Sequence, residues 1–280
     1  MGDNKSIFEF ANKFGYDSPW VENWIPKTES SVNNQWKGLS EINRINKNPI
    51  YTKQKGKSKY KILLFGGVDM YNDGSYGSNK NLGRYLEIIA LSKKYNIPLQ
   101  KGDIQLVNSP LFSERMDGKD IYNDILNIVK KNFDLKNGTL ILYGYSWGGQ
   151  LLMEFLKFFK ESKINIDLLL TIDAAKGLVS FSVNNDVTNN VKNNLNLYQT
   201  KLSVIGSRGG PNEGSNVKNV DLTGEKNSQS EKVTHSTIDE YTLLYSAQVI
   251  VYALKNIYSF KSRTEQQIKK DIKVYASQGF

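Results

Sequence analysis

A serine between two glycines is the residue of this sequence that is best placed to do chemistry. Gly144-Tyr145-Ser146-Trp147-Gly148 fits the pattern G-x-S-x-G, with the apolar run GTLILY before it and GQLLMEFLKFF after it. A strand followed by a helix would put Ser146 on a sharp turn with its hydroxyl exposed. The N-terminus of that helix would favour a developing negative charge. The alternative is a glycine-rich turn with an incidental serine, and the two flanking runs favour the nucleophile.

The chain has one histidine, His235, in the stretch EKVTHSTIDE. A serine hydroxyl becomes a nucleophile when a neighbouring base takes its proton, and histidine is the usual base. If Ser146 acts in this way, its base can only be His235. A lone histidine is more commonly a surface or capping residue, so its role depends on whether the fold brings it to Ser146.

The elements that would position these residues alternate along the chain. We predict strands in YKILLFGG, DIQLVNSP, GTLILYG and NIDLLLTIDAA, and helices in NKNLGRYLEIIALSKKY, DIYNDILNIVKKNF and QLLMEFLKFFK. Beyond Lys176 the sequence is polar and rich in Asn, with short strand candidates in VSFSV, LNLYQ, KLSVIGS and NVKNVDLTG. A long helix from about Ile238 to Tyr258 and an amphipathic tail follow. This alternation predicts an α/β fold with a mostly parallel central sheet and helices on both faces.

The first part of the chain differs from the rest. Residues 1–58 hold three of the four tryptophans, show little periodicity apart from FEFANKFG, and end in the Lys/Gly-rich stretch KQKGKSK. We predict that residues 1–58 form an N-terminal arm and linker, and that residues 59–280 form the catalytic domain.

The strand, the G-x-S-x-G turn and the helix together resemble the α/β-hydrolase superfamily, over roughly residues 60–258. The resemblance implies the chain order nucleophile, acid, histidine, and it places the histidine after the last strand, where His235 lies. For the acid we favour Asp173, which ends the strand DLLLTIDAA, one strand earlier than in most of the superfamily. Asp186 and Asp221 are the reserves. We expect Asp239 to cap the following helix, and Asp167 to lie at the wrong end of its strand.

The resemblance also implies an oxyanion hole built from backbone N–H groups. One donor would be Trp147, the residue after the nucleophile. The second would come from the loop after the first strand, where Gly66 and Gly67 permit a bend that aims an N–H at the site. Gly67 or Val68 is the expected donor, although a Gly-Gly pair is also simply a flexible turn.

Composition excludes several other chemistries. The absence of cysteine rules out disulfides, thiolate metal sites and a cysteine nucleophile, and a single histidine argues against metal catalysis. We expect no cofactor. The formal net charge of +9 comes from dispersed lysines without a nucleic-acid motif, so we expect no nucleic-acid partner and favour contact with a membrane surface. No secretory signal pattern or membrane-spanning run is evident, which indicates a cytoplasmic protein or one exported without such a signal.

The substrate is inferred from the predicted loops. Trp147, the loop after the first strand and the segment 177–200, a candidate lid, would surround Ser146 with apolar residues. They favour a lipase or phospholipase that cleaves lipid acyl esters. VKNNLNLYQT, NVDLTG and THSTID resemble stretches of bacterial lipase-like hydrolases, including antibacterial effector domains, which would imply a carrier or an immunity protein as partner. A polar-ester or thioester hydrolase and a non-catalytic binding module are the alternatives.

Overall fold

A computed structural model of the chain describes residues 22–24, 56–69, 77–92, 94–100, 102–110, 119–175, 184–201, 208–227 and 229–277. Its centre is a sheet of seven strands in the order β1-β3-β2-β4-β5-β6-β7. The strands are β1 (Glu22–Trp24), β2 (Tyr60–Asp69), β3 (Ile104–Pro110), β4 (Thr139–Tyr145), β5 (Leu168–Ile172), β6 (Asn194–Tyr198) and β7 (Val217–Asp221). Every neighbouring pair is parallel.

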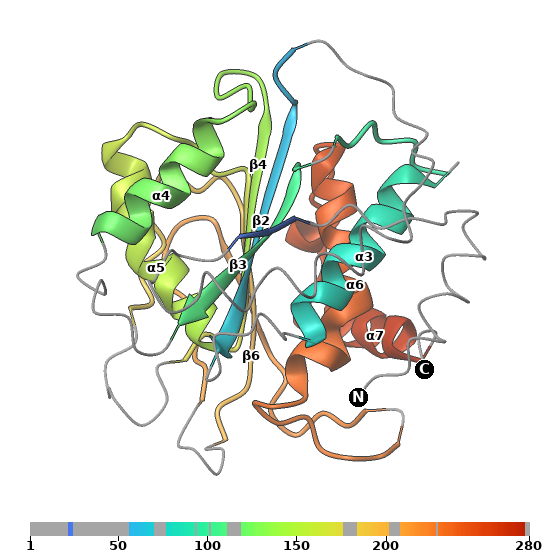
Figure 1. Cartoon of the computed structure of the whole chain (residues 1–280). Helices are drawn as coiled ribbons and strands as arrows, with labels where there is room; N and C mark the ends of the chain where they lie inside the picture. The colour runs from blue at the N-terminus through green and yellow to red at the C-terminus, as the bar shows by residue number, and fades with distance from the viewer. Residues whose placement is uncertain are drawn as a thin grey trace.

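Helices cover both faces of this sheet, as Figure 1 shows. On one side lie α4 (Lys119–Lys130) and α5 (Ser146–Glu161). On the other lie α3 (Gly77–Leu91), α6 (Ile238–Leu254) and α7 (Glu265–Ala276). The short 3-10 helix η2 (Ser259–Ser262) joins α6 to α7. The predicted α/β fold class, a mostly parallel sheet between two helical layers, is therefore confirmed.

The strand sequences explain why both faces are covered. Successive side chains of a strand point to opposite faces, so a continuous apolar run must be buried on both sides. In β2, Ile62 and Leu64 pack into the core beneath α3, α6 and α7, whereas Leu63 and Phe65 pack beneath α4 and α5. Each of these four side chains is buried. The sheet is thus held between two apolar cores, and its carboxyl edge stays available for polar residues.

The predicted helices and strands that lie within the described residues are present in the structure, with two differences. Six residues of the N-terminal arm are described: Glu22–Trp24 form β1, which pairs with β3 at one edge of the sheet, and residues 56–58 lead into β2. The long closing helix ends at Leu254, four residues before the predicted end, and the chain continues into η2. The helical stretch FEFANKFG and the strand candidate VSFSV lie outside the described residues, as does most of KLSVIGS.

Buried amide side chains hold the segment 208–214 against the later strands. Asn196 of β6 donates from Nδ2 to the carbonyl of Gly210 (2.8 Å), and Asn212 donates from Nδ2 to Thr171 Oγ1 of β5 (3.0 Å). The backbone N–H of Asn212 donates to Asn219 Oδ1 of β7 (2.9 Å). Because unpaired polar groups are costly in a core, these bonds fix the segment in one position.

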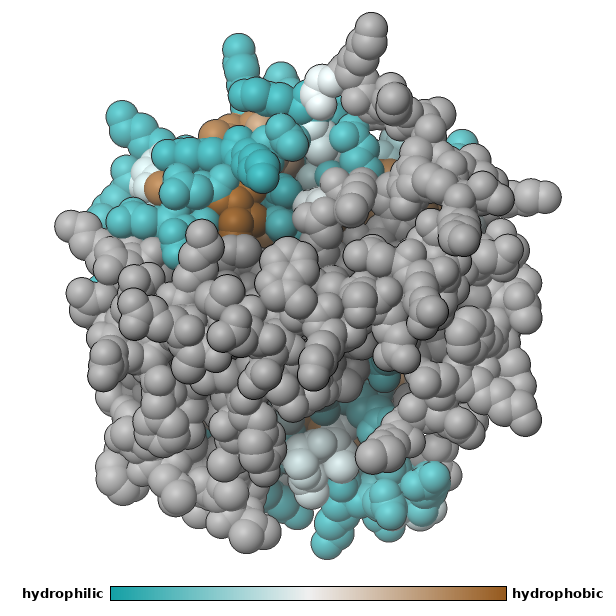
Figure 2. Space-filling model, viewed as in Figure 1, coloured by the Kyte–Doolittle hydropathy of each residue, from teal (hydrophilic) through white to brown (hydrophobic). Residues whose placement is uncertain are grey.

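The described surface is mostly polar. Figure 2 shows hydrophilic residues around a small hydrophobic area near α4, and the large exposed apolar side chains Leu135, Ile257 and Val274 are scattered over different elements. None of the described helices is both long enough and apolar enough to cross a membrane.

Candidate active site

The turn between β4 and α5 carries Ser146 in an unusual backbone conformation. Strand β4 ends at Tyr145 and α5 begins at Ser146, whose φ angle is +54°. A non-glycine residue in this left-handed region is strained, and such strain is concentrated at functional sites. The turn is also tightly packed, because a Cβ atom added to Gly148 would lie 2.0 Å from the carbonyl oxygen of Gly66. The predicted strand-to-helix turn is present, and a glycine is required beside it.

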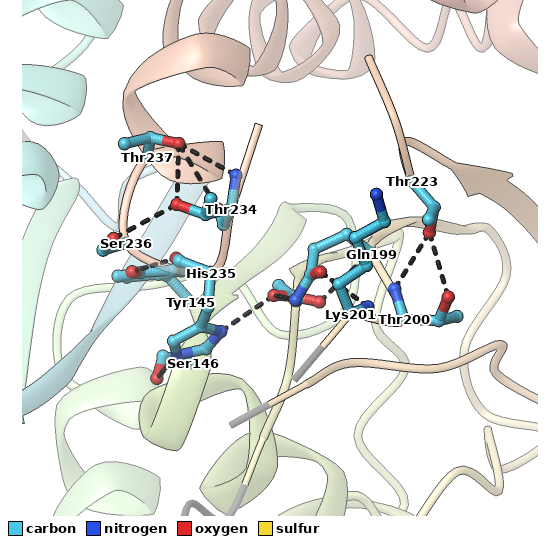
Figure 3. A network of polar contacts seen from close by, with 11 residues as sticks. Tyr145, Ser146, Gln199, Thr200, Lys201, Thr223, Thr234, His235, Ser236 and Thr237 are labelled. Atoms are coloured by element: carbon cyan, nitrogen blue, oxygen red, sulfur yellow. Dashed lines mark hydrogen bonds and ion pairs between the residues drawn. The ribbon is translucent and has the colours of Figure 1, made fainter. Parts of the chain in front are cut away.

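His235 lies within hydrogen-bonding distance of the serine. Its Nε2 is 2.8 Å from Ser146 Oγ, and both side chains are almost completely buried, at 5% and 9% exposure. The histidine belongs to the loop that precedes α6, so β4 and this loop meet although 89 positions separate the two residues. Figure 3 shows the two side chains pointing toward each other.

Tyr145, the residue before Ser146, contacts both the backbone and the ring of His235. Its hydroxyl donates to the backbone carbonyl of His235 (2.7 Å), and its ring stacks on the imidazole with the centroids 5.6 Å apart. Burial raises the pKa of the Tyr145 hydroxyl far above its ordinary value, and the nearby carboxylates of Asp239 and Asp173 add to this effect. The hydroxyl therefore keeps its proton, and its hydrogen bond, over the neutral and mildly alkaline range.

Asp173 completes the arrangement. It follows β5 directly, has a φ angle of +44°, and is fully buried. Its Oδ2 is 2.8 Å from Nδ1 of His235. With a proton on Nδ1, the ring donates to the carboxylate and leaves Nε2 free to accept the serine proton. The structure thus brings together the three predicted residues, Ser146, His235 and Asp173.

The other aspartates lie elsewhere. Asp186 is exposed, and Asp221 accepts from the backbone N–H of Thr223 (2.8 Å). Asp167 lies at the opposite end of β5, where its Oδ2 accepts from the backbone N–H of Leu140 (2.9 Å) and its Oδ1 pairs with Lys192. The predicted capping role of Asp239 is wrong.

Helix α6 has Thr237 at its N-cap position, and Asp239 is the second residue of the helix itself. A carboxylate in the first turn still interacts favourably with the helix dipole.

Gln199, which the sequence did not single out, donates to the Asp173 carboxylate together with His235. Its side-chain Nε2 donates to Asp173 Oδ2 (3.0 Å), and its backbone N–H donates to Asp173 Oδ1 (3.0 Å). It lies immediately after β6, and Figure 3 shows it beside the histidine and serine. Glutamine after a strand has no signature that distinguishes it from other polar loop residues, so only the fold could identify it.

Two of the three predicted oxyanion donors, Trp147 and Gly67, lie beside the serine. Trp147 is the second residue of α5, where backbone N–H groups have no partner within the helix. The pairing of β2 with β3 shifts register between Phe65 and Val68, so Gly66 and Gly67 form a bulge. Gly67 lies close to Ser146, since a Cβ atom added to Gly67 would be 3.7 Å from the Ser146 Cβ. Val68 pairs with Ser109, and the unpaired Gly67 is therefore the better candidate for the second donor.

A metal site is not evident in the described part of the chain, which holds no group of three His, Asp or Glu side chains that could bind a metal ion.

Three features decide the fold: the strand order, the strand-to-helix turn at Ser146, and the loop before α6 that carries His235. It is an α/β-hydrolase-like fold.

Comparison with known proteins adds little to this geometry. No protein-family model matches the sequence, and a search of curated proteins finds no match. Among solved structures, an arylesterase is similar with 10% sequence identity, a TM-score of 0.38, and coverage of 92% of this chain and all of that chain. A proposed cell surface hydrolase from Lactobacillus plantarum is similar with 15% identity, a TM-score of 0.32, and coverage of 94% and 98%. At these values the likeness carries no weight for the chemistry, which depends on the residues described above.

Proposed function

We propose that the protein is a serine hydrolase that cleaves carboxylic esters through Ser146, His235 and Asp173. Ser146 Oγ attacks the carbonyl carbon while His235 Nε2 takes the hydroxyl proton. When the tetrahedral intermediate collapses, His235 returns that proton to the leaving alcohol and an acyl group stays on Ser146. Water, activated by the same histidine, then releases the acid. Asp173 keeps the ring in the required tautomer and stabilises the imidazolium.

The single observation that carries this proposal is the continuous hydrogen-bonded chain of three buried residues. Ser146 Oγ to His235 Nε2 and His235 Nδ1 to Asp173 Oδ2 are both 2.8 Å. Each distance lies within the range that proton transfer requires. Ser146 also has the positive φ angle expected of a nucleophile on a sharp strand-to-helix turn, although Ser230 shares such an angle outside the site. An incidental serine in a turn would not need the hydrogen-bonded chain.

A lipid acyl ester is the substrate we favour. Trp147, directly after the nucleophile, is partly buried and packs against the apolar core beneath α4 and α5. The described part of the segment predicted to cover the site does not do so, because Asn194–Tyr198 form β6, and Val187 lies beside Val217 near the amino ends of β6 and β7, opposite the edge that carries Ser146. The apolar ring beside the nucleophile suits a hydrocarbon chain, and the net charge of +9 would help at an anionic lipid surface. Membrane contact, a carrier and an immunity protein stay predictions.

Labelling with a fluorophosphonate tests the chemistry, because an activated serine displaces the fluoride of this reagent and becomes phosphonylated. The wild-type protein is expected to be labelled at Ser146, and Ser146→Ala and His235→Ala are expected not to be. Ser246→Ala is a suitable control, since Ser246 is a buried serine of α6 outside the site. Labelling that survives Ser146→Ala would refute the proposed nucleophile.

A substrate panel then tests the lipid part of the proposal. Phospholipids, triglycerides and short p-nitrophenyl esters should be compared below and above the concentration at which each forms aggregates. We expect the highest kcat/KM for long acyl chains and a rise in rate at the interface. A preference for short, polar or thioester substrates without that rise would assign the same triad to a polar-ester or thioester hydrolase instead.

A further inference from the structure

The acid of the site is buried so completely that its charge needs several partners. Asp173 has no exposed surface, and an ionised carboxylate away from water is costly unless hydrogen bonds replace its hydration. His235 supplies one donor, to Oδ2. This single neutral donor leaves the remaining lone pairs of both oxygens to be satisfied by other groups.

Gln199 supplies two further donors to that carboxylate. Its backbone N–H reaches Oδ1 and its side-chain Nε2 reaches Oδ2, each at 3.0 Å. Oδ2 is also the oxygen that faces His235, so the side chain of Gln199 and the imidazole share one acceptor atom. The glutamine therefore holds in place the carboxylate that orients the histidine.

The amide of Gln199 is itself fixed in one orientation. Its Oε1 accepts from the backbone N–H of Lys201 (2.8 Å), so the amide nitrogen must face Asp173. The backbone carbonyl of Gln199 accepts from the N–H of Gly209 (3.1 Å), and the residue is 1% exposed. Gly209 belongs to the segment that the buried asparagines hold in place. Nothing in this arrangement leaves the amide free to rotate.

We propose that Gln199 is a positioning residue of the reaction, which holds the Asp173 carboxylate toward His235 and so fixes the imidazole with its proton on Nδ1. This inference rests on the proposed function for its effect on rate. Its structural part, the tautomer of His235, can be measured without any activity.

The matched pair Gln199→Met and Gln248→Met separates positioning from packing. Methionine keeps the volume of glutamine and removes its donor. Gln248 is another buried glutamine, on α6, whose Oε1 accepts from Tyr95 (3.1 Å) at a distance from the site. We expect Gln199→Met to slow fluorophosphonate labelling about 10- to 100-fold, the factor that corresponds to one hydrogen bond to a charged group, and Gln248→Met to change it less than about threefold.

Nitrogen NMR of the protein labelled with ¹⁵N-histidine reports the tautomer directly, because His235 is the only histidine. The wild-type protein and Gln248→Met should show the Nδ1–H tautomer, and Gln199→Met a mixture of both. Labelling within about threefold of wild type, or slowed labelling with an unchanged tautomer, would overturn the positioning role.

If Gln199→Met does not fold, Gln199→Asn takes its place, because the shorter side chain brings its amide out of hydrogen-bonding distance of Asp173 Oδ2. The same slowed labelling and mixed tautomer are expected, and an unchanged rate and tautomer would refute the inference. A wild-type protein that is not labelled would remove the proposed function, whereas the tautomer comparison would still decide the role of Gln199.

Discussion

Gly148→Ala tests whether the close approach of β2 to α5 shapes the site. A Cβ atom at this position would lie 2.0 Å from the carbonyl oxygen of Gly66 and 2.7 Å from the carbonyl carbon of Phe65. Cβ atoms essentially never approach other atoms more closely than 3.0 Å, so the two backbones must separate by about 1 Å. No side chain can rotate away to relieve the contact, because both atoms belong to the backbone. The displaced segment is the bulge that carries the candidate oxyanion donor.

Two opposing effects contribute to the stability of this variant. Alanine stabilises a helix relative to glycine by about 0.5–1 kcal/mol. Overpacking of a tight contact costs about 1–3 kcal/mol, and a contact between two backbone segments lies at the upper end. We expect a net loss of about 2 kcal/mol in the free energy of unfolding. For a chain of this size that corresponds to a Tm lower by about 4–8 °C. A shift of about 1 Å at the reacting groups should slow labelling about 100-fold.

The assay combines fluorophosphonate labelling with thermal unfolding followed by circular dichroism. Gly210→Ala is the matched control, since a Cβ atom added there has no heavy atom within 4 Å. It should label at the wild-type rate. If Gly148→Ala labels as fast as Gly210→Ala and has the same Tm, the close approach does not constrain the site and the reasoning is refuted.

Three further predictions follow from the same contacts. Asp173→Asn should slow labelling about 10⁴-fold, because an amide does not hold the required tautomer of His235. Asp167→Asn, at the other end of β5, is the control and should leave the labelling rate of the folded protein unchanged. Equal effects of the two substitutions would argue against Asp173 as the acid. Gly209→Ala should slow labelling about 10- to 100-fold, since the added Cβ would lie 2.1 Å from Asp173 Oδ1, and a wild-type rate would show that the acid tolerates displacement. The stability that the buried tyrosines contribute should be complete below pH of about 10 and fall above it, because burial raises their pKa in the folded state and the unfolded chain releases those protons first. Phenolate absorbance and circular dichroism should then change together at alkaline pH. Ionisation of every tyrosine with the fold intact would contradict this prediction. The buried tyrosines concerned are Tyr143, Tyr145 and Tyr245.

The architecture could be predicted because its signals are local. Apolar runs such as ILLF in β2 require burial on both faces, and they alternate with helical periodicity. β1 could not be predicted, because three residues of mixed polarity, Glu22–Trp24, carry no strand pattern and depend on β3 for their pairing. The end of the closing helix at Leu254 was overestimated for a related reason, since apolar residues continue past the last helical turn.

The site was predictable to the extent that residue type limits the choice. Ser146 was marked by its two glycines and flanking elements, and His235 by being the only histidine. Asp173 stood among several aspartates of similar appearance, and its place after β5 favoured it. Gln199 and Tyr145 gave no signal, because their importance comes from hydrogen bonds to residues distant in the sequence. Such partners are defined by the packing of β4, β5 and β6 and not by any local pattern.

The order of the three site residues along the chain has a consequence for biosynthesis. Ser146 and Asp173 leave the ribosome well before His235, which is 89 positions after the serine and 62 after the acid. A nascent or truncated chain without that histidine has a hydroxyl but no base, and is therefore inert. The three site residues come together only when the loop before α6 docks on a completed sheet. On the proposed lipid substrate, this late docking would delay damage to the lipids of the cell that makes the protein until synthesis is nearly complete.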